Sequence, residues 1–351
     1  MSQLEKTTKL FPQTEIWNDS CSVKELQYCI DNGGVGATTN PVIVLNVLKS
    51  ELKDYEASIK NFIFENPTDS EDEIAWKVIK LLGSDASKLL LKKYEETNGL
   101  QGRISFQTNA KFYNNSAKMV ENAVELAGTV VNSQIKAPTS KAGVEAFEEM
   151  TYKGISINAT VSFTVPQAIA VAEAVERGLA RRVSEGLPID QMNPVCTIMA
   201  GRVDDYIKKV SKGLDTTVAP EMLEWAGVAV VKNAYKLYQE RGYKTRLLVA
   251  AYRNAYHWNQ FIGANMVLTI PYGWQKKFAN YECEIKETIH DEVNPVYLNE
   301  LLKIEEFKKA YHEQGMQIEE FEHYGAFVDT MNQFLGGYDE LCQLIRKYMV
   351  K

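Results

Sequence analysis

Cysteine and histidine are scarce in this sequence, and their spacing does not suit a metal site. Its 351 residues include five scattered cysteines without a CxxC pair and four histidines that stand apart from one another. An odd number of scattered cysteines is typical of reduced thiols in a cytoplasmic protein. Because neither residue type is clustered, we expect no zinc site.

The sequence also lacks a long apolar run and an excess of positive charge. The N-terminal segment has no apolar core of a signal peptide, and no stretch approaches the length of a membrane span. The formal net charge of −7 argues against a nucleic acid or an anionic membrane as the main partner, although a local basic pocket for a phosphate remains compatible with it. With 45% apolar and 24% charged residues, the chain has the composition of a soluble globular protein with a large core.

Short β-branched runs alternate with longer amphipathic stretches along the chain. Several of the runs are almost continuously apolar, as expected for strands that are covered on both faces. Eight segments are predicted as strands: Thr14–Trp17, Val35–Thr39, Arg103–Thr108, Asn132–Lys136, Ile155–Ala159, Pro194–Met199, Arg246–Ala251 and Met266–Ile270.

The stretches between these runs have helical periodicity. Ala117–Ala127 places its apolar residues on one stripe, and Gln167–Ala180 and Leu223–Glu240 show the same pattern. The long connection Val42–Leu100 is predicted to hold several helices, and the charged tail after Tyr272 is predicted to be helical too. Strands separated by helices imply a parallel sheet with crossover helices.

Two architectures fit this order, a doubly wound open sheet and a closed barrel. We favour the barrel because polar residues recur at the C-terminal ends of most of the predicted strands, where barrel enzymes build their sites. The prediction is therefore an α/β fold, a (β/α)₈ TIM barrel with additional helices in the connection between the second and third strands and at the C-terminus. Residues 1–351 are expected to form one domain, with the helices from about residue 273 packing on the barrel.

The polar residues at the strand ends are the candidates for chemistry. On a barrel they would all face one mouth. They are Asp19, Asn40, Gln107, Lys136, Asn158, Thr160, Thr197, Arg202 and Arg253.

Lys136 is the sharpest candidate, since it ends an apolar strand and is followed closely by Pro138. Burial at a barrel mouth lowers the pKa of an amine, because desolvation disfavours the ammonium form. A neutral amine can attack a ketose carbonyl and give a protonated imine, which is an electron sink for C–C cleavage. The alternative is a solvated surface lysine, the commonest fate of this residue type. The other strand-end residues favour the nucleophile.

Each of the remaining candidates also has a plain structural alternative. Asp19 could accept the hydroxyl proton that is lost in C–C cleavage, or it could begin a helix. Asn40, Asn158 and Thr160 could orient hydroxyls or a water, or they could make loop hydrogen bonds.

Arg202 and Arg253 are candidates for binding a substrate phosphate, because a guanidinium group binds phosphate in a bidentate manner. The alternative for each is a surface ion pair, and Asp204 and Asp205 stand close to Arg202 in the sequence.

Together these residues resemble the transaldolase family over nearly the whole chain. The most specific segments are GATTNP, IKAPTSKAGVEAF, GISINATVSFTVPQAIAVAEA and GRVDDY, found in this order from WNDS to FEHYGAFVDTMNQF. The later segments AAYRN and LTIPYGW are similar to the seventh and eighth strands of the family.

The resemblance implies a (β/α)₈ barrel that moves a dihydroxyacetone unit from a ketose phosphate to an aldose phosphate in carbohydrate metabolism (the pentose phosphate pathway). It implies Lys136 as the Schiff-base lysine and Asp19 as the acid and base for C–C cleavage. No cofactor or metal is implied, and a homodimer is left open. Further roles are implied for hydroxyl binding by Asn40 and Asn158, for water binding by Thr160, and for phosphate binding by Arg202 and Arg253.

Five positions depart from the family pattern. Gln107 replaces the glutamate that relays protons through a water, and an amide cannot accept a proton at neutral pH. Related fructose-6-phosphate aldolases also carry glutamine there, with a tyrosine where this chain has Met199. Ala251 and Thr197 stand where serines are usual, and Val42 stands where a small hydroxyl residue is common.

Three hypotheses about function follow. The first is a transaldolase-type transferase or a close fructose-6-phosphate aldolase variant. The second is a barrel without catalysis that binds a sugar phosphate. Gln107 favours it, and the presence of Lys136, Asp19 and the two arginines opposes it. The third is an aldolase for an unusual ketose, modified or non-phosphorylated, which Ala251 favours.

Overall fold

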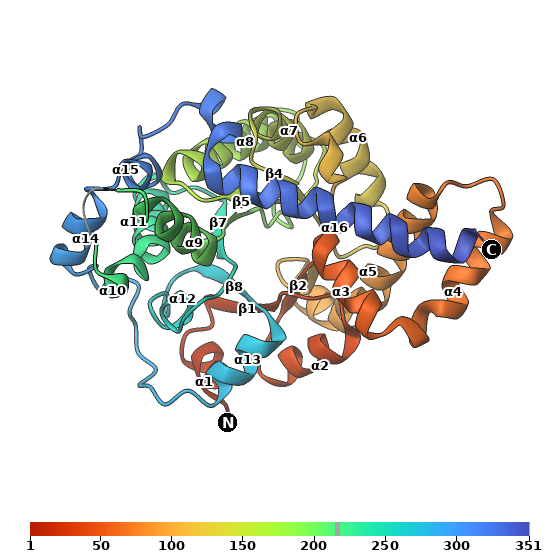
Figure 1. Cartoon of the computed structure of the whole chain (residues 1–351), viewed down its shortest axis with the longest axis horizontal. Helices are drawn as coiled ribbons and strands as arrows, with labels where there is room; N and C mark the ends of the chain where they lie inside the picture. Colours follow the sequence, from red (N-terminus) through yellow and green to blue (C-terminus); the bar gives the residue numbers. More distant parts are fainter. Residues whose placement is uncertain (215–217, 351) are drawn as a thin grey trace.

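Eight parallel strands close into a barrel in sequence order, as predicted (Figure 1). The computed structural model describes residues 1–214 and 218–350. Each strand begins within two residues of the first residue of a predicted strand. The strands are β1 Thr14–Asn18, β2 Gly36–Thr38, β3 Arg103–Gln107, β4 Ser133–Pro138, β5 Ile157–Ser162, β6 Val195–Ile198, β7 Arg246–Val249 and β8 Met266–Ile270.

The register of the strands brings the candidate residues to one level of the barrel. Gln107 of β3 lies beside Lys136 of β4, which in turn lies beside Asn158 of β5. Successive side chains of a strand point to opposite faces of the sheet, so the side chains of these three paired residues point to the same side of the barrel wall. β5 runs on to Ser162, beyond its predicted end, through a register shift at Val161, whose φ is 54°.

The predicted helices are present, with one break. The segment Leu223–Glu240 is divided at Glu224 and Trp225, whose ring packs 4.7 Å from that of Tyr256. The helices before β8 are α1 Gln3–Leu10, α2 Val23–Asp31, α3 Pro41–Ser50, α4 Leu52–Glu65, α5 Glu71–Glu96, η1 Ala110–Phe112, α6 Ser116–Ala127, α7 Lys141–Tyr152, α8 Val165–Ser184, α9 Ala200–Ser211, α10 Pro220–Leu223, α11 Ala226–Arg241 and α12 Tyr256–Asn259.

The helices after β8 pack on the barrel, and the longest of them runs across it (Figure 1). α16 packs on α3 and α5 of the β2–β3 connection, and Gly337 lies close to Val42, since a Cβ there would be 2.7 Å from Val42 Cγ2. Val42 is partly buried against the hydrophobic core, an environment that suits an apolar side chain. The helices are α13 Tyr272–Ala279, α14 Pro295–Leu301, α15 Glu305–Tyr311, η2 Ile318–His323 and α16 Gly325–Met349.

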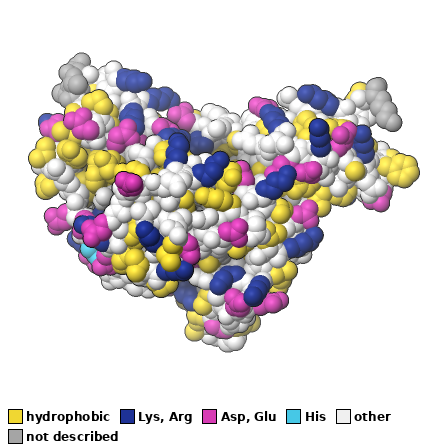
Figure 2. Space-filling view, turned by 90° about the horizontal axis from the view of Figure 1, so that it is seen from below, with side chains coloured by type: hydrophobic (Ala, Val, Ile, Leu, Met, Phe, Trp, Pro, Cys, Tyr) yellow, Lys and Arg dark blue, Asp and Glu magenta, His cyan; other side chains and the backbone are white. Residues whose placement is uncertain are grey.

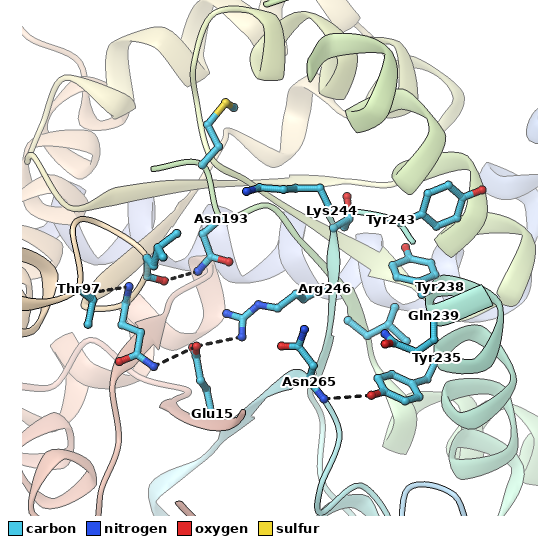
Figure 3. A pocket seen from close by; sticks show the side chains of 15 residues that line it. Glu15, Thr97, Asn193, Tyr235, Tyr238, Gln239, Tyr243, Lys244, Arg246 and Asn265 are labelled. Atoms are coloured by element: carbon cyan, nitrogen blue, oxygen red, sulfur yellow. Dashed lines mark hydrogen bonds and ion pairs between the residues drawn. The ribbon is translucent and has the colours of Figure 1, made fainter. Parts of the chain in front are cut away.

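The N-terminal mouth of the barrel is closed by a network of polar side chains (Figure 3). The Glu15 carboxylate accepts hydrogen bonds from Arg246 Nη1 at 2.9 Å, Gln101 Nε2 at 3.1 Å and Trp17 Nε1 at 3.0 Å. A cavity of about 600 Å³ lies against this network and is also lined by Tyr235. This end of the barrel is thus held by an almost buried ion pair.

Acidic and basic side chains are interspersed over the face of the molecule in Figure 2. Ion pairs within single helices include Lys9 with Glu5 and Lys60 with Glu56. Across residues 1–214 and 218–350, none of the helices combines the length and the apolarity needed to span a membrane.

Candidate active site

Lys136 extends from β4 into the C-terminal mouth of the barrel and is almost completely buried. Its side chain is 2% exposed, and among the described residues no carboxylate lies within ion-pair distance of Nζ. Burial lowers the pKa of the amine; the charge of Asp19 opposes this shift and the charge of Arg202 adds to it. Lys136 is therefore not a solvated surface lysine, and a neutral amine is favoured at this position.

Asp19 follows β1 and is held at the mouth by the neighbouring strands. Its backbone N–H donates to Ile270 O at 3.2 Å, and Thr38 Oγ1 donates to its carboxylate at 2.7 Å. The residue that caps α2 is Ser22, so Asp19 does not have the helix-capping role considered as its alternative. Burial raises the pKa of the Asp19 carboxyl, against the opposing charge of Lys136. Burial thus acts against the charged form of both groups, whereas their mutual attraction acts in the other direction.

A chain of buried hydrogen bonds fixes Asn158 inside the barrel. Thr197 Oγ1 donates to Asn158 Oδ1 at 2.7 Å, and Asn158 Nδ2 donates to Ser105 Oγ at 3.1 Å. Ser105 in turn donates to Gln134 Oε1 at 3.0 Å. In this structure Thr197 contacts Asn158 directly, so its hydroxyl serves to orient that amide.

Two candidate residues at the mouth are buried without a partner. Within the described parts of the chain, neither amide atom of Gln107 nor the hydroxyl of Thr160 has a hydrogen-bond partner. Gln107 is 4% exposed and Thr160 is 0% exposed. Buried polar groups are nearly always paired, so these atoms are suited to bind a substrate hydroxyl or a water.

Asn40 has a structural function in addition to any contact with substrate. Its Oδ1 accepts a hydrogen bond from Ile43 N–H at 2.9 Å and thereby caps α3, with Pro41 at the first helical position. Asn40 therefore makes the local hydrogen bond that was considered as its alternative role. The Nδ2 group makes no hydrogen bond within the described residues.

The two arginines lie together at one side of the mouth. Arg202 donates from Nη1 to Thr330 at 3.3 Å and from Nη2 to Gln333 at 2.5 Å, and its buried Nε has no partner in the described residues. Burial lowers the pKa of Arg202, and the charge of Arg253 lowers it further. A cavity of about 310 Å³ adjoins Arg202 and Thr330. Two close cations of this kind can attract an anionic group.

Among the described residues, the surface ion pair considered as the alternative role is present for Arg253 but not for Arg202. Arg202 forms no ion pair with Asp204 or Asp205 within the described residues. Instead, Asp205 accepts from Arg253 Nε at 2.9 Å and from Arg253 Nη2 at 2.7 Å. Asp204 is completely buried and contacts His257.

Sequence reasoning missed several residues that shape this mouth. The hydroxyls of Thr38 and Thr269 form a hydrogen bond of 2.7 Å, and the Thr38 hydroxyl also contacts the Asp19 carboxylate. The hydroxyl of Tyr252 is buried without a partner in the described chain, and burial and then the charge of Asp19 raise its pKa well above the ordinary value. Alternation along the strands could have indicated Ser105, two residues before Gln107. Tyr252 gives no comparable signal, because it follows the end of β7.

Comparisons with known proteins agree with this arrangement. The model of the transaldolase/fructose-6-phosphate aldolase family matches residues 16–330. The chain is 27% identical to a transaldolase of Thiobacillus denitrificans over 323 residues, which is 86% of this chain and 84% of that protein. It is 30% identical to a transaldolase of Mycobacterium ulcerans over 237 residues and to transaldolase 2 of Streptomyces avermitilis over 236 residues. In both cases the match spans 64% of this chain and 62% of the relative.

The family match covers most of the chain, and the barrel places a buried lysine at its C-terminal mouth. The resemblance noticed in the sequence is confirmed. The chain belongs to the transaldolase/fructose-6-phosphate aldolase family.

Proposed function

We propose that this protein is a transaldolase-type transferase that moves a dihydroxyacetone unit from a ketose phosphate to an aldose phosphate. The observation that carries the proposal is the buried Lys136 amine, which shares the barrel mouth with the Asp19 carboxyl. In a family of this chemistry, such an amine is suited to form a Schiff base with a ketose. We place the protein in carbohydrate metabolism of the cytoplasm.

The chemistry begins with the neutral amine of Lys136, which attacks the ketose carbonyl and gives a carbinolamine. The carbinolamine loses water and becomes a protonated imine. A protonated Asp19 can supply a proton to the departing water, since burial raises the pKa of its carboxyl. Loss of this proton leaves Asp19 as a carboxylate.

The carboxylate of Asp19 then removes the proton of the substrate's C4 hydroxyl. The C3–C4 bond breaks, its electrons pass into the imine to form an enamine, and the aldose leaves. The enamine adds to an acceptor aldose by the reverse steps, and water releases the new ketose from Lys136. Thr38 supports this exchange by donating to the Asp19 carboxylate at 2.7 Å.

The other residues of the mouth have roles in binding. The fixed amide of Asn158 and the free Nδ2 of Asn40 are placed to bind substrate hydroxyls. Gln107 and Thr160 hold the water that is lost and gained, since their buried polar atoms are unpartnered among the described residues. The guanidinium groups of Arg202 and Arg253 bind the phosphate.

A second candidate function is an aldolase that releases free dihydroxyacetone or acts on an unusual ketose. Two observations favour it: Gln107 offers no carboxylate for the water, and Ala251 offers no hydroxyl near the arginines. A barrel that binds a sugar phosphate without catalysis would not need a desolvated amine, and the low exposure of Lys136 opposes that reading.

The product mixture from fructose 6-phosphate, with and without erythrose 4-phosphate, separates these functions. Transfer only in the presence of the acceptor supports the transaldolase. Free dihydroxyacetone in its absence supports the aldolase. Turnover of neither mixture would reject both for this donor.

A further inference from the structure

A buried carboxylate and a buried imidazole lie next to the segments that carry the two arginines. Asp204 of α9 and His257 of α12 are each 0% exposed, and His257 Nε2 lies 2.8 Å from Asp204 Oδ2. The other carboxylate oxygen, Asp204 Oδ1, accepts from Gly227 N–H at 2.8 Å at the beginning of α11. The pair therefore connects three helices that surround the mouth.

The second ring nitrogen of His257 reaches the backbone of a proposed binding residue. His257 Nδ1 accepts a hydrogen bond from Arg253 N–H at 3.1 Å. A backbone N–H can only donate, so Nδ1 must carry its lone pair. The ring proton then resides on Nε2 and is donated to Asp204. The carboxylate thereby selects the tautomer that holds Arg253.

Two consecutive aspartates of α9 fix both the backbone and the guanidinium group of Arg253. Asp204 acts on its backbone through His257, while Asp205 accepts from its guanidinium at 2.7 and 2.9 Å. Arg202 precedes these aspartates on the same helix. The spacing between the two guanidinium groups is thus set by one helix, although Arg253 itself stands in an irregular segment after β7.

We propose that Asp204 and His257 are positioning residues that fix the Arg253 segment, so that its guanidinium meets the anionic end of the substrate together with Arg202. The proposal rests on the proposed function of the arginines. A buried carboxylate is costly unless it is paired and hydrogen-bonded, and here both of its oxygens are used. This burial makes a role in orientation more reasonable than an incidental contact.

The sharpest test is Asp204→Asn, which keeps the size of the side chain. The amide oxygen can still accept from Gly227 N–H, but the amide nitrogen then faces His257 Nε2 and donates to it. The ring proton moves to Nδ1, which can no longer accept from Arg253 N–H. We expect KM for fructose 6-phosphate to rise about tenfold, with a much smaller change in turnover of non-phosphorylated fructose.

Two variants of His257 form a matched pair for the same test. In His257→Asn, the amide oxygen lies near the position of Nδ1 and can accept from Arg253 N–H. In His257→Gln, the amide reaches Asp204 but leaves Arg253 N–H without an acceptor. We expect His257→Gln to reproduce the KM defect and His257→Asn to retain more of the affinity for phosphorylated donor.

Inorganic phosphate provides a readout that does not depend on turnover. Phosphate should raise the Tm of the wild-type protein, because a ligand of the native state stabilises it. The same addition should raise the Tm of Asp204→Asn and His257→Gln less. Trapping of dihydroxyacetone on Lys136 by borohydride reports separately on the imine chemistry, so its failure would count against the proposed function rather than against the positioning residues.

Equal losses on phosphorylated and non-phosphorylated substrates in Asp204→Asn and both His257 variants would overturn the positioning role. The same conclusion would follow if phosphate failed to stabilise the wild-type protein, or stabilised it and the variants equally. If Asp204→Asn does not fold, the His257→Asn and His257→Gln pair decides the question by the same measurements.

Discussion

The two mouths of the barrel treat buried polar groups in opposite ways. At the N-terminal mouth, the Glu15 carboxylate is paired with Arg246 (Figure 3) and also accepts hydrogen bonds from Gln101 and Trp17. At the C-terminal mouth, within the described residues, the Lys136 amine has no ion-pair partner and the Gln107 amide has no hydrogen bond. Satisfied groups stabilise the native chain by themselves, whereas unsatisfied ones need a partner from outside it.

The difference concerns Lys136, Gln107 and Thr160 rather than every polar group, since Asn158 and Asp19 at the same mouth are hydrogen-bonded. The hydroxyl of Thr245 at the N-terminal mouth also lacks a partner in the described chain, although it is only 2% exposed. A single hydroxyl is a small cost compared with a buried amine or carboxyl. We therefore expect the mouth with Glu15 to contribute to stability and propose the mouth with Lys136 as the place of the chemistry.

The largest expected effect is the loss of activity in Lys136→Met. Without the amine no imine can form, so transfer and cleavage should both fall below detection. The control is Lys141→Ala, since Lys141 is an exposed residue that pairs with Glu319 and should be dispensable. Full activity in Lys136→Met would remove the basis of the proposed function.

The same variant should change how stability depends on pH. Burial lowers the pKa of Lys136 in the folded protein, whereas an unfolded lysine titrates at about 10.4. Between these two values the unfolded chain binds the extra proton, so the free energy of unfolding rises with pH. Lys136→Met should lose this rise, as measured by denaturant unfolding at pH 7 and pH 10.

Arg246→Met is expected to have the next largest effect, and it should act on stability alone. It leaves the Glu15 carboxylate almost buried without its cation, which costs about 3–5 kcal/mol of the free energy of unfolding. The kcat of the folded variant should stay unchanged, because the residue lies at the opposite mouth. The double variant Glu15→Gln/Arg246→Met should recover part of the loss. A large drop in kcat without a loss of stability would contradict the division between the mouths.

Arg202→Ala and Arg253→Ala are expected to weaken the binding of phosphorylated substrates. A hydrogen bond to a charged group contributes about 1.5–3 kcal/mol, so KM should rise roughly ten- to a hundredfold. Turnover of non-phosphorylated sugars should change much less. If both kinds of substrate lose equally, these arginines are structural.

Gln107→Glu is expected to have the smallest effect, and it would sharpen the comparison. A carboxylate can accept and return protons of the water, whereas the amide can only orient it. Imine formation and hydrolysis should become faster in single-turnover measurements, and transfer between phosphorylated sugars should be favoured. If neither rate changes, Gln107 does not contact the catalytic water. A loss of activity would favour the unusual-donor function instead.

The barrel was predictable because the strands of a parallel sheet are covered on both faces. Such strands are recognisable as short, almost continuously apolar runs. The break at Glu224 and Trp225, where the Trp225 ring packs against that of Tyr256, was not predicted. Strand-end position alone indicated Lys136 and Gln107, because the C-terminal ends of parallel strands must meet.

The surroundings of the arginines were less accessible to sequence reasoning. Asp204 in GRVDDY has the pattern of a solvated charge, and its partner His257 lies 53 residues away. Only the packing of α9 against α12 and α11 makes that carboxylate a buried group. Asn40 shows a similar limit, because its cap on α3 and a contact with substrate call for the same residue type.

Borohydride reduction in the presence of dihydroxyacetone or fructose 6-phosphate tests the assignment of chemistry to the C-terminal mouth most directly. Peptide mass spectrometry should find the added mass of the reduced substrate on the peptide that contains Lys136 and should not find it in Lys136→Met. Labelling of Lys141 in place of Lys136, or labelling that persists in Lys136→Met, would contradict the account.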